Sequence, residues 1–244
     1  MGETKPAMPA SSTVNTRLSS YTPNFTVAVS VLITVRLLSA VYNLVADCDE
    51  TFNYWEPTHY LMFGYGFQTW EYSPVYGIRS YSYIFIHAVI GKLASFIVGD
   101  NKIAIFYAIR AALGTFCAIS EAVFYCGALK KFGPNIAKLC LLLMTFSAGM
   151  FISSTAYLPS SFSMYGVMLA FGCWFGDRFT WAVTMAAFSC IGGWPFTGIV
   201  FAPMGLDILY KKGILRFTWW SILSLVYFLL PSVLIDLYYY KKIT

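Results

Sequence analysis

Charged residues are scarce in this chain of 244 residues: they make up 11% of the sequence, whereas soluble domains usually contain about 25%. A water-soluble globule would have too little polar surface, so the composition excludes the ordinary soluble class and indicates a membrane protein. Hydrophobic residues reach 58% and aromatic residues 19%, and Tyr and Trp favour the level of the lipid headgroups. We expect no nucleic acid as a partner, because the 16 basic residues are scattered or paired rather than gathered in a run.

Metal-binding motifs are also missing. The six cysteines show no Cys-x-x-Cys spacing, and five of them lie within apolar runs. The two histidines, His59 and His87, form no His-x-x-x-His or His-Glu-x-x-His pattern. The sequence therefore predicts neither a metal site nor a disulfide framework, and we expect no cofactor.

Long apolar runs dominate what is present, and a membrane-spanning helix needs roughly 20 apolar residues. The runs are 25–46, 81–98, 103–128, 136–157, 162–176, 181–203 and 215–236. They predict an all-α fold, a polytopic bundle of transmembrane helices over residues 25–244, preceded by a polar tail over residues 1–24. Trp194 and Pro195 interrupt one run, which a membrane helix tolerates where its neighbours satisfy the freed backbone groups.

Residues 47–80 form the longest segment between two runs, and this segment is acidic. It contains five of the eleven acidic residues of the chain and a single base, Arg79. The tail carries two bases, and loops on the cytosolic side of a membrane are enriched in Lys and Arg. We therefore expect the tail in the cytosol and residues 47–80 on the far side. Strict alternation of the runs then puts Lys130 and Lys131 on the far side as well, against the same rule.

Three ionisable residues lie in the middle of apolar runs: Arg36, Arg110 and Glu121. A charge at that depth costs at least about 2.5–3.5 kcal/mol on insertion scales, so each should face the protein interior or a wet cavity. An internal salt bridge and a role beside a polar substrate both explain these residues, and the sequence does not choose between the two.

The sequence DCDETFNYWEP directly follows the first run. In a helix, Asp49, Asn53 and Glu56 would share one face. Asp47 precedes Glu50 by three residues, as in a capping box, which favours a helix cap over a catalytic role for Asp47. Asp49 and Glu50 remain as candidate catalytic carboxylates, because adjacent carboxylates repel and a dry setting would raise the pKa of one, as suits a general base. A solvated acidic loop explains the same spacing.

Aromatic residues and one arginine mark the second half of this segment, GYGFQTWEYSPVYGIRS. Trp70, Tyr72 and Tyr76 supply apolar faces with polar tips, as stacking on a sugar or seating at the membrane interface would require. Arg79 lies where the next run begins, at headgroup depth. A guanidinium there suits a lipid phosphate, and interfacial snorkelling explains it equally well.

DCDETFNYWEP and GFQTWEYSPVYGIRSY resemble the first lumenal loop of the alpha-1,2-mannosyltransferases of the asparagine-linked glycosylation pathway. Those enzymes use dolichyl-phosphate-mannose and belong to the GT-C superfamily of membrane glycosyltransferases. Three later stretches also resemble family segments: LPSSF at 158–162, GWPF at 193–196 and DLYYY at 236–240. The resemblance implies a GT-C-like multi-pass bundle in the endoplasmic reticulum membrane, with residues 47–80 as a lumenal catalytic loop.

The resemblance also implies the chemistry. It implies an inverting transfer of mannose from dolichyl-phosphate-mannose to a dolichyl-diphosphate-linked oligosaccharide, with no metal required. The acidic pair of the family maps onto Asp49 and Glu50, and Asp49 is the first candidate for the base. The candidates for donor and acceptor binding are Arg79, Tyr72, Trp70, Tyr76, Asn53 and Glu56. Family members continue past Thr244, so we expect the C-terminal remainder of the family to be missing from this chain.

Two alternatives to an active enzyme stay open. A small transporter or channel would explain the intramembrane charges, but the large acidic loop and the lack of an inverted repeat argue against it. A truncated, non-catalytic relative would only bind partners or dolichol lipid. Within the enzyme class, the nearest alternative is a mannosyltransferase of glycolipid-anchor synthesis. Those relatives resemble a His-Pro-Asp-Glu start, which DCDETFNYWEP lacks.

Overall fold

The computed structural model describes residues 21–241, and within them all the regular elements are helices, without a strand. The predicted all-α fold is confirmed. Most of the predicted tail, residues 1–20, lies outside the described residues, as do residues 242–244. By length and composition, four of the described helices could cross a membrane. They are α1 (Phe25–Tyr42), α3 (Tyr81–Val98), α4 (Lys102–Phe132) and α10 (Ile214–Tyr240).

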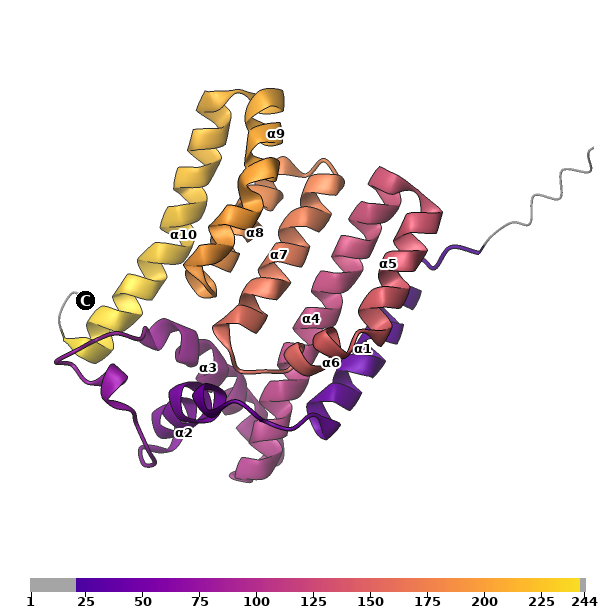
Figure 1. Ribbon diagram of the computed structural model, residues 1–244. Coiled ribbons are helices and arrows are strands. Elements are labelled where there is room, and N and C mark those ends of the chain that lie inside the picture. The colour runs from indigo at the N-terminus through magenta and orange to yellow at the C-terminus, as the bar shows by residue number, and fades with distance from the viewer. Residues whose placement is uncertain (1–20, 242–244) are drawn as a thin grey trace, which may run out of the picture.

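The long helix α4 runs through the middle of the bundle, and α1 packs against it in the opposite direction (Figure 1). Tyr125, near the end of α4, donates to the carbonyl of Pro23 just before α1, at 2.6 Å. Arg110, near the start of α4, donates to the carbonyl of Asn43 just after α1, at 2.8 Å. The start of α1 and the end of α4 therefore lie at the same end of the bundle.

On its other side α4 packs against α7 (Pro159–Phe175), and α7 packs against α8 (Phe179–Gly192). A Cβ atom added to Gly127 of α4 would lie 2.4 Å from the carbonyl oxygen of Gly172 on α7. The two backbones touch there, and small residues permit such close approach between membrane helices. The layer continues from α8 to α10, as Figure 1 shows.

Two predicted runs do not form single helices, which corrects the expectation for 136–157 and 181–203. The first divides into α5 (Pro134–Phe146) and α6 (Ala148–Ser153), followed by an extended segment that leads to α7. Ser147 separates the two helices, because its side chain caps α6 by accepting the N–H of Met150 at 3.3 Å.

The second run folds back on itself. Helix α8 ends at Gly192, a 3₁₀ segment, η3 (Pro195–Phe201), follows the predicted interruption, and α9 (Ala202–Lys212) continues from it. Lys212, the last residue of α9, lies over the ring of Phe179, the first residue of α8, at 4.8 Å. The segment therefore returns to the end where it began.

Helix α3 has the predicted bounds but lies along one end of the bundle. At its start, the Tyr81 hydroxyl accepts a hydrogen bond from Gln68 at 2.7 Å. Just after its end, Lys102 donates to the hydroxyl of Tyr65. Helix α3 is about 27 Å long, and yet both its ends reach the same short loop. A helix that ran the length of the bundle would carry one end away from this loop, so α3, although long and apolar enough to be a candidate span, lies along this end of the bundle.

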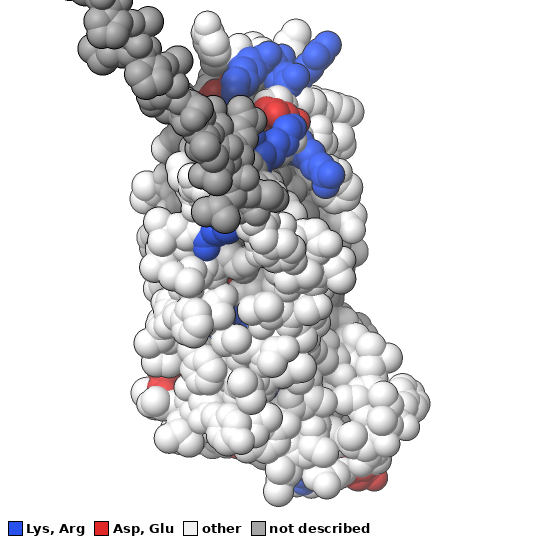
Figure 2. All heavy atoms as spheres, turned by 90° about the vertical axis from the view of Figure 1, so that its right-hand side faces the viewer, with Lys and Arg blue, Asp and Glu red and all other residues white. Residues whose placement is uncertain are grey.

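Charge separates the two ends of the bundle. We call the end made by residues 43–81, 99–102 and 236–241 the loop end, and the end made by residues 130–134, 176–179 and 211–216 the basic end. Figure 2 shows Lys and Arg side chains gathered at the basic end. Because α3 stays at the loop end, α4 leads from the loop end to the basic end. Lys130 and Lys131 therefore lie at the end where α1 begins, which removes the conflict that strict alternation created.

Candidate active site

A cavity of about 520 Å³ opens at the loop end, and segments far apart in the sequence form its walls. The loop contributes Asp49, Tyr72 and Arg79 among others. The start of α3 contributes Ser82 and Tyr83. The remaining walls come from the start of α7, at 158–160, and from the residues that end and follow α8, at 191–194. Two of the stretches that resemble family segments, LPSSF and GWPF, thus meet the acidic loop in one cavity.

A helical turn with an unusual register positions the acidic residues. The carboxylate of Asp47 accepts the N–H of Asp49 at 2.8 Å, which confirms the predicted cap. A π-helix follows, η1 (Glu50–Trp55), in which backbone bonds reach five residues back instead of four. Asn53 stays beside Asp49 and donates to its carboxylate at 2.9 Å. Glu56 does not share a face with Asp49 and Asn53, because a π-helix has more residues per turn than the α-helix in which the three would align.

The adjacent carboxylates Asp49 and Glu50 lie in opposite environments. Asp49 is exposed and lines the cavity. Glu50 is buried, does not line the cavity, and accepts the backbone N–H of Tyr157 at 3.0 Å. Burial raises the pKa of Glu50, against the lowering effects of that hydrogen bond and of the nearby Arg110. The carboxylate of Glu50 is therefore engaged by a backbone group of the protein. In Asp49 one carboxylate oxygen has no hydrogen bond from the described residues and could accept one from a hydroxyl group.

Arg79 lines the cavity, and two protein groups hold its guanidinium. Its Nε donates to the Glu71 carboxylate, and its Nη1 donates to the Tyr54 hydroxyl at 2.5 Å. Within residues 21–241, no protein group accepts a hydrogen bond from its Nη2. A guanidinium with free donors beside a cavity is suited to a phosphate group.

The C-terminal part of α10 fixes the backbone around Arg79. The Tyr240 hydroxyl donates to the carbonyl of Arg79 at 2.6 Å, and Asp236 accepts the N–H of Tyr81 at 2.7 Å. Tyr239 also stacks on the ring of Tyr81, with 4.6 Å between centroids. DLYYY, the third stretch that resembles a family segment, therefore holds the backbone of Arg79 and the side chain and backbone of Tyr81 in place.

The other candidate binding residues divide into two groups. Tyr72 lines the cavity and is buried, with its hydroxyl bonded to the carbonyl of Asn53 at 2.8 Å, and burial raises its pKa. Trp70 and Tyr76 are each 60% exposed and contact one another outside the cavity, with 5.2 Å between ring centroids. Glu56 accepts the N–H of Phe67 at 3.3 Å and shapes the loop. The structure thus brings together Asp49, Tyr72 and Arg79, and leaves Glu50, Asn53, Glu56, Trp70 and Tyr76 outside the lining.

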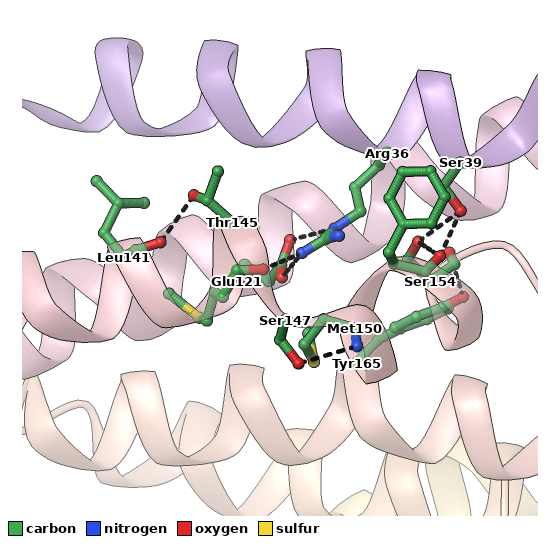
Figure 3. Close-up of polar contacts among 11 residues, drawn as sticks. Arg36, Ser39, Glu121, Leu141, Thr145, Ser147, Met150, Ser154 and Tyr165 are labelled. Atoms are coloured by element: carbon green, nitrogen blue, oxygen red, sulfur yellow. Dashed lines mark hydrogen bonds and ion pairs between the residues drawn. The ribbon is translucent and has the colours of Figure 1, made fainter. Parts of the chain in front are cut away.

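The intramembrane charges Arg36 and Glu121 pair with each other inside the bundle (Figure 3). Both side chains are fully buried, and Arg36 Nη2 lies 2.5 Å from Glu121 Oε1. The same Nη2 donates to the carbonyl of Met144 near the end of α5, at 2.6 Å. Ser39, one turn further along α1, donates to the carbonyl of Phe151 in α6. The internal salt bridge is therefore the correct explanation for this pair, and it ties α1 and α4 to the break between α5 and α6.

Arg110 supports the extended segment that leads into α7. Its Nη2 donates to the Thr155 hydroxyl at 3.2 Å. The Tyr157 hydroxyl donates to the carbonyl of Phe106 at 3.2 Å, and the Tyr157 N–H is bound by Glu50. This segment continues directly into the cavity wall at 158–160. Glu50 and Arg110 therefore help to position the wall without lining the cavity.

An apolar groove of about 510 Å³ continues from the cavity between α3, α8 and α10. The two spaces share Ser82, Tyr83, Ile191 and Gly192 as walls. Further along, the groove is lined mainly by the aliphatic and aromatic side chains of α8 and α10. The polar cavity therefore opens sideways onto a surface that suits a hydrocarbon chain.

Sequence reasoning missed most of the cavity wall. Tyr54 and Tyr83 gave no local signal, because one lies in the π-helix and the other within an apolar run. Leu158 and Trp194 belong to stretches that resemble family segments, and that resemblance was the signal available for them. Nothing in the sequence alone brings these segments to one place.

One group of possible metal ligands occurs within residues 21–241. Asp47, Cys48 and Asp49 are exposed, and their ligand atoms lie within 4.8 Å of one another. Asp47 is already engaged as a helix cap, and a thiol with carboxylates combines soft and hard ligands. Neither feature favours a metal ion, and we assign none to this group.

Comparison with known proteins gives one family. A profile described as the Alg9-like mannosyltransferase family matches residues 27–244. The chain is 44% identical over 224 residues to "Alpha-1,2-mannosyltransferase ALG9" of Homo sapiens. The matched region covers 91% of this chain and 37% of that protein. The chain is 40% identical over 223 residues to the Drosophila melanogaster protein of the same description, with 91% and 36% covered.

A more distant relative is "GPI mannosyltransferase 3" of Candida albicans, 27% identical over 204 residues, with 81% of this chain and 41% of that protein covered. No solved structure matches the chain. The chain thus spans little more than a third of the length of the human and Drosophila relatives.

Proposed function

Because the chain belongs to the Alg9-like mannosyltransferase family, we propose that its polar cavity transfers mannose from dolichyl-phosphate-mannose to a lipid-linked oligosaccharide, forming an alpha-1,2 linkage. One observation carries the proposal: the free carboxylate of Asp49 and the restrained guanidinium of Arg79 line the same cavity. Since the chain spans 37% of the human relative, the proposal concerns the full-length protein.

The two residues have complementary roles in an inverting transfer. Asp49 removes the proton from the acceptor hydroxyl as the oxygen of that hydroxyl bonds to the anomeric carbon of mannose. The bond from that carbon to the phosphate breaks on the opposite side, and the dolichyl phosphate leaves with the electron pair. Arg79 donates hydrogen bonds to that phosphate, while Glu71 and Tyr54 keep the guanidinium in place. General base catalysis of this kind is typically worth about 10²–10⁴-fold.

The apolar groove supports a lipid-linked donor. It adjoins the cavity through Ser82 and Tyr83, which follow Arg79 closely in the sequence. A phosphate bound by Arg79 would therefore have an apolar surface beside it for the first units of its polyisoprenyl chain. A water-soluble nucleotide sugar would have no use for such a surface.

The charges support an orientation in the endoplasmic reticulum membrane, with the loop end in the lumen. The basic end carries six Lys and Arg residues, and cytosolic loops are enriched in such residues. The exposed Cys48 tests the orientation. In sealed microsomes, a membrane-impermeant maleimide should label Cys48 only after permeabilisation, whereas a Lys131→Cys variant should be labelled at once. Labelling of Cys48 in sealed vesicles contradicts the orientation.

A transfer assay tests the function itself. The full-length protein, purified in detergent, is given radiolabelled dolichyl-phosphate-mannose and a lipid-linked oligosaccharide acceptor. We expect one labelled mannose on the acceptor, removable by an alpha-1,2-specific mannosidase. Binding of donor without transfer would instead identify a non-catalytic relative, and a product resistant to the mannosidase would contradict the linkage.

A further inference from the structure

A separate cavity of about 440 Å³ lies at the basic end, between α4 and α7 and beside the start of α1. It shares no lining residue with the cavity at the loop end. Lys130 and Arg178 lie on it, and both are exposed. Lys130 links the end of α4 to the end of α7, because its Nζ donates to the carbonyl of Gly176 at 2.9 Å and pairs with Asp177 at 2.9 Å. The proposed transfer at the loop end uses neither cation.

The charge at the basic end is only partly balanced. Its nearby acids are Asp177 and Asp207, and each already pairs with a lysine at 2.9 Å, Lys130 and Lys211 respectively. Arg178 has no carboxylate partner within residues 21–241. The other bases of this end without such a partner in the described chain are Lys131, Lys212 and Arg216. Among the described residues, the cavity therefore carries a guanidinium without a carboxylate partner, in a region of net positive charge.

The shape of the cavity follows from the crossing of α4 and α7. Gly127 and Gly172 bring the two backbones into contact, so no side chain fills the space beside them. Phe25 and Val123 form an apolar wall of the same cavity. The space therefore combines cationic residues with an apolar wall, at the end of membrane helices. A free phosphate ion needs only the cations, whereas a phospholipid uses both.

We propose that this cavity binds the headgroup of an anionic phospholipid. The phosphate contacts Arg178 and Lys130, and the first carbons of an acyl chain lie against Phe25 and Val123. Basic pockets between membrane helices are known to recognise anionic headgroups in this way. The inference does not depend on the transfer reaction, because it uses the opposite end of the molecule.

Native mass spectrometry of the purified full-length protein tests the proposal. The protein is delipidated in detergent and titrated with phosphatidylserine or phosphatidylcholine. We expect one phosphatidylserine to bind at least about fivefold more tightly than phosphatidylcholine, since each basic residue near an anionic lipid contributes about that factor. Arg178→Gln should lose about fivefold in phosphatidylserine affinity. Lys92→Gln removes an exposed charge from α3, away from this cavity, and should leave the affinity unchanged.

Three results would overturn the proposal. They are equal affinity for both lipids, an unchanged affinity in Arg178→Gln, and displacement of the bound lipid by millimolar inorganic phosphate, which would identify a phosphate site. If Arg178→Gln does not fold, Phe25→Ala decides, because Phe25 is 45% exposed and its replacement leaves every charge in place. That variant should weaken phosphatidylserine binding, and unchanged binding would rule out the apolar wall.

Discussion

Within residues 21–241 the chain has two arginine–glutamate pairs, one inside the bundle and one beside the cavity at the loop end. The Arg36–Glu121 pair joins α1 to α4, and both side chains are 0% exposed. The Arg79–Glu71 pair lies in the loop, where the side chains are 22% and 20% exposed. Arg36 also donates to a backbone carbonyl, whereas Arg79 donates to a tyrosine hydroxyl, and no group in the described part of the chain accepts a hydrogen bond from its Nη2.

The difference between the pairs separates a structural charge from one available to a ligand. Water cannot reach Arg36 or Glu121, so each charge depends on the other for compensation. Breaking such a pair is costly, although replacing both partners by apolar residues is often neutral. The Arg79–Glu71 pair is partly solvated, and partly exposed pairs contribute little to stability. The Arg79–Glu71 pair instead restrains the guanidinium of a residue that lines the cavity.

The largest expected effect comes from breaking the buried pair. Arg36→Met leaves the Glu121 carboxylate without a partner in the interior, which should cost about 3–5 kcal/mol of stability. We expect a much lower thermal midpoint in detergent and poor recovery by size-exclusion chromatography. The double variant Arg36→Met, Glu121→Met should recover most of the loss. If the single variant is as stable as the wild type, the buried pair does not hold α1 and α4 together.

A smaller effect, and one on activity alone, is expected at the cavity pair. Arg79→Ala removes the charge-assisted hydrogen bonds that we propose for the donor phosphate, and it should lower kcat/KM for dolichyl-phosphate-mannose by about 10- to 100-fold. The thermal midpoint should stay near that of the wild type. Arg79→Lys should recover only part of the activity, because an ammonium group lacks the planar fork of donors. Unchanged donor dependence in the alanine variant would remove Arg79 from the site.

The smallest effect is expected from Glu71→Gln. The amide can still accept a hydrogen bond from Arg79, and Tyr54 continues to hold Nη1. Since partly exposed pairs are worth about 0–1 kcal/mol, donor use should fall by no more than about fivefold. The donor titration used for the arginine variants measures this directly. A loss as large as that of Arg79→Ala would mean that Glu71 itself contacts the substrate.

The sequence predicts where most helices lie along the chain, but not how each helix is oriented in the bundle. Five of the seven apolar runs correspond to single helices, and α3 has the predicted bounds of 81–98. Hydropathy does not say whether a helix crosses the bundle or lies along its end, because both environments bury apolar side chains. That choice is made by contacts distant in sequence, such as those of Tyr65 and Gln68 with the two ends of α3.

For the site, the sequence predicts residue types better than their placement. Asp49 and Arg79 are predicted as candidates from their chemistry and their family resemblance, and both line the cavity. The expectation that Asp49 and Glu56 share one face depends on an α-helix, whereas the chain forms a π-helix there. The same local register decides which of the two adjacent carboxylates is buried. Glu50 is bound to Tyr157, which is more than a hundred residues away, and no local pattern indicates such a contact.

Isosteric amide variants of the two adjacent carboxylates separate the exposed residue from the buried one. Asp49→Asn can still accept the hydrogen bond from Asn53, but it cannot take a proton from the acceptor hydroxyl. Glu50→Gln can still accept the N–H of Tyr157, so the cavity wall should keep its position. Asp47→Asn is a further control, because Asn caps a helix about as well as Asp.

The decisive measurement is kcat for mannose transfer by the full-length variants under saturating donor. If Asp49 is the base, we expect a loss of at least about 100-fold for Asp49→Asn, a loss below about 10-fold for Glu50→Gln, and near-normal turnover for Asp47→Asn. Near-normal transfer by Asp49→Asn together with loss of transfer in Glu50→Gln would contradict this assignment, because the buried carboxylate would then be the base.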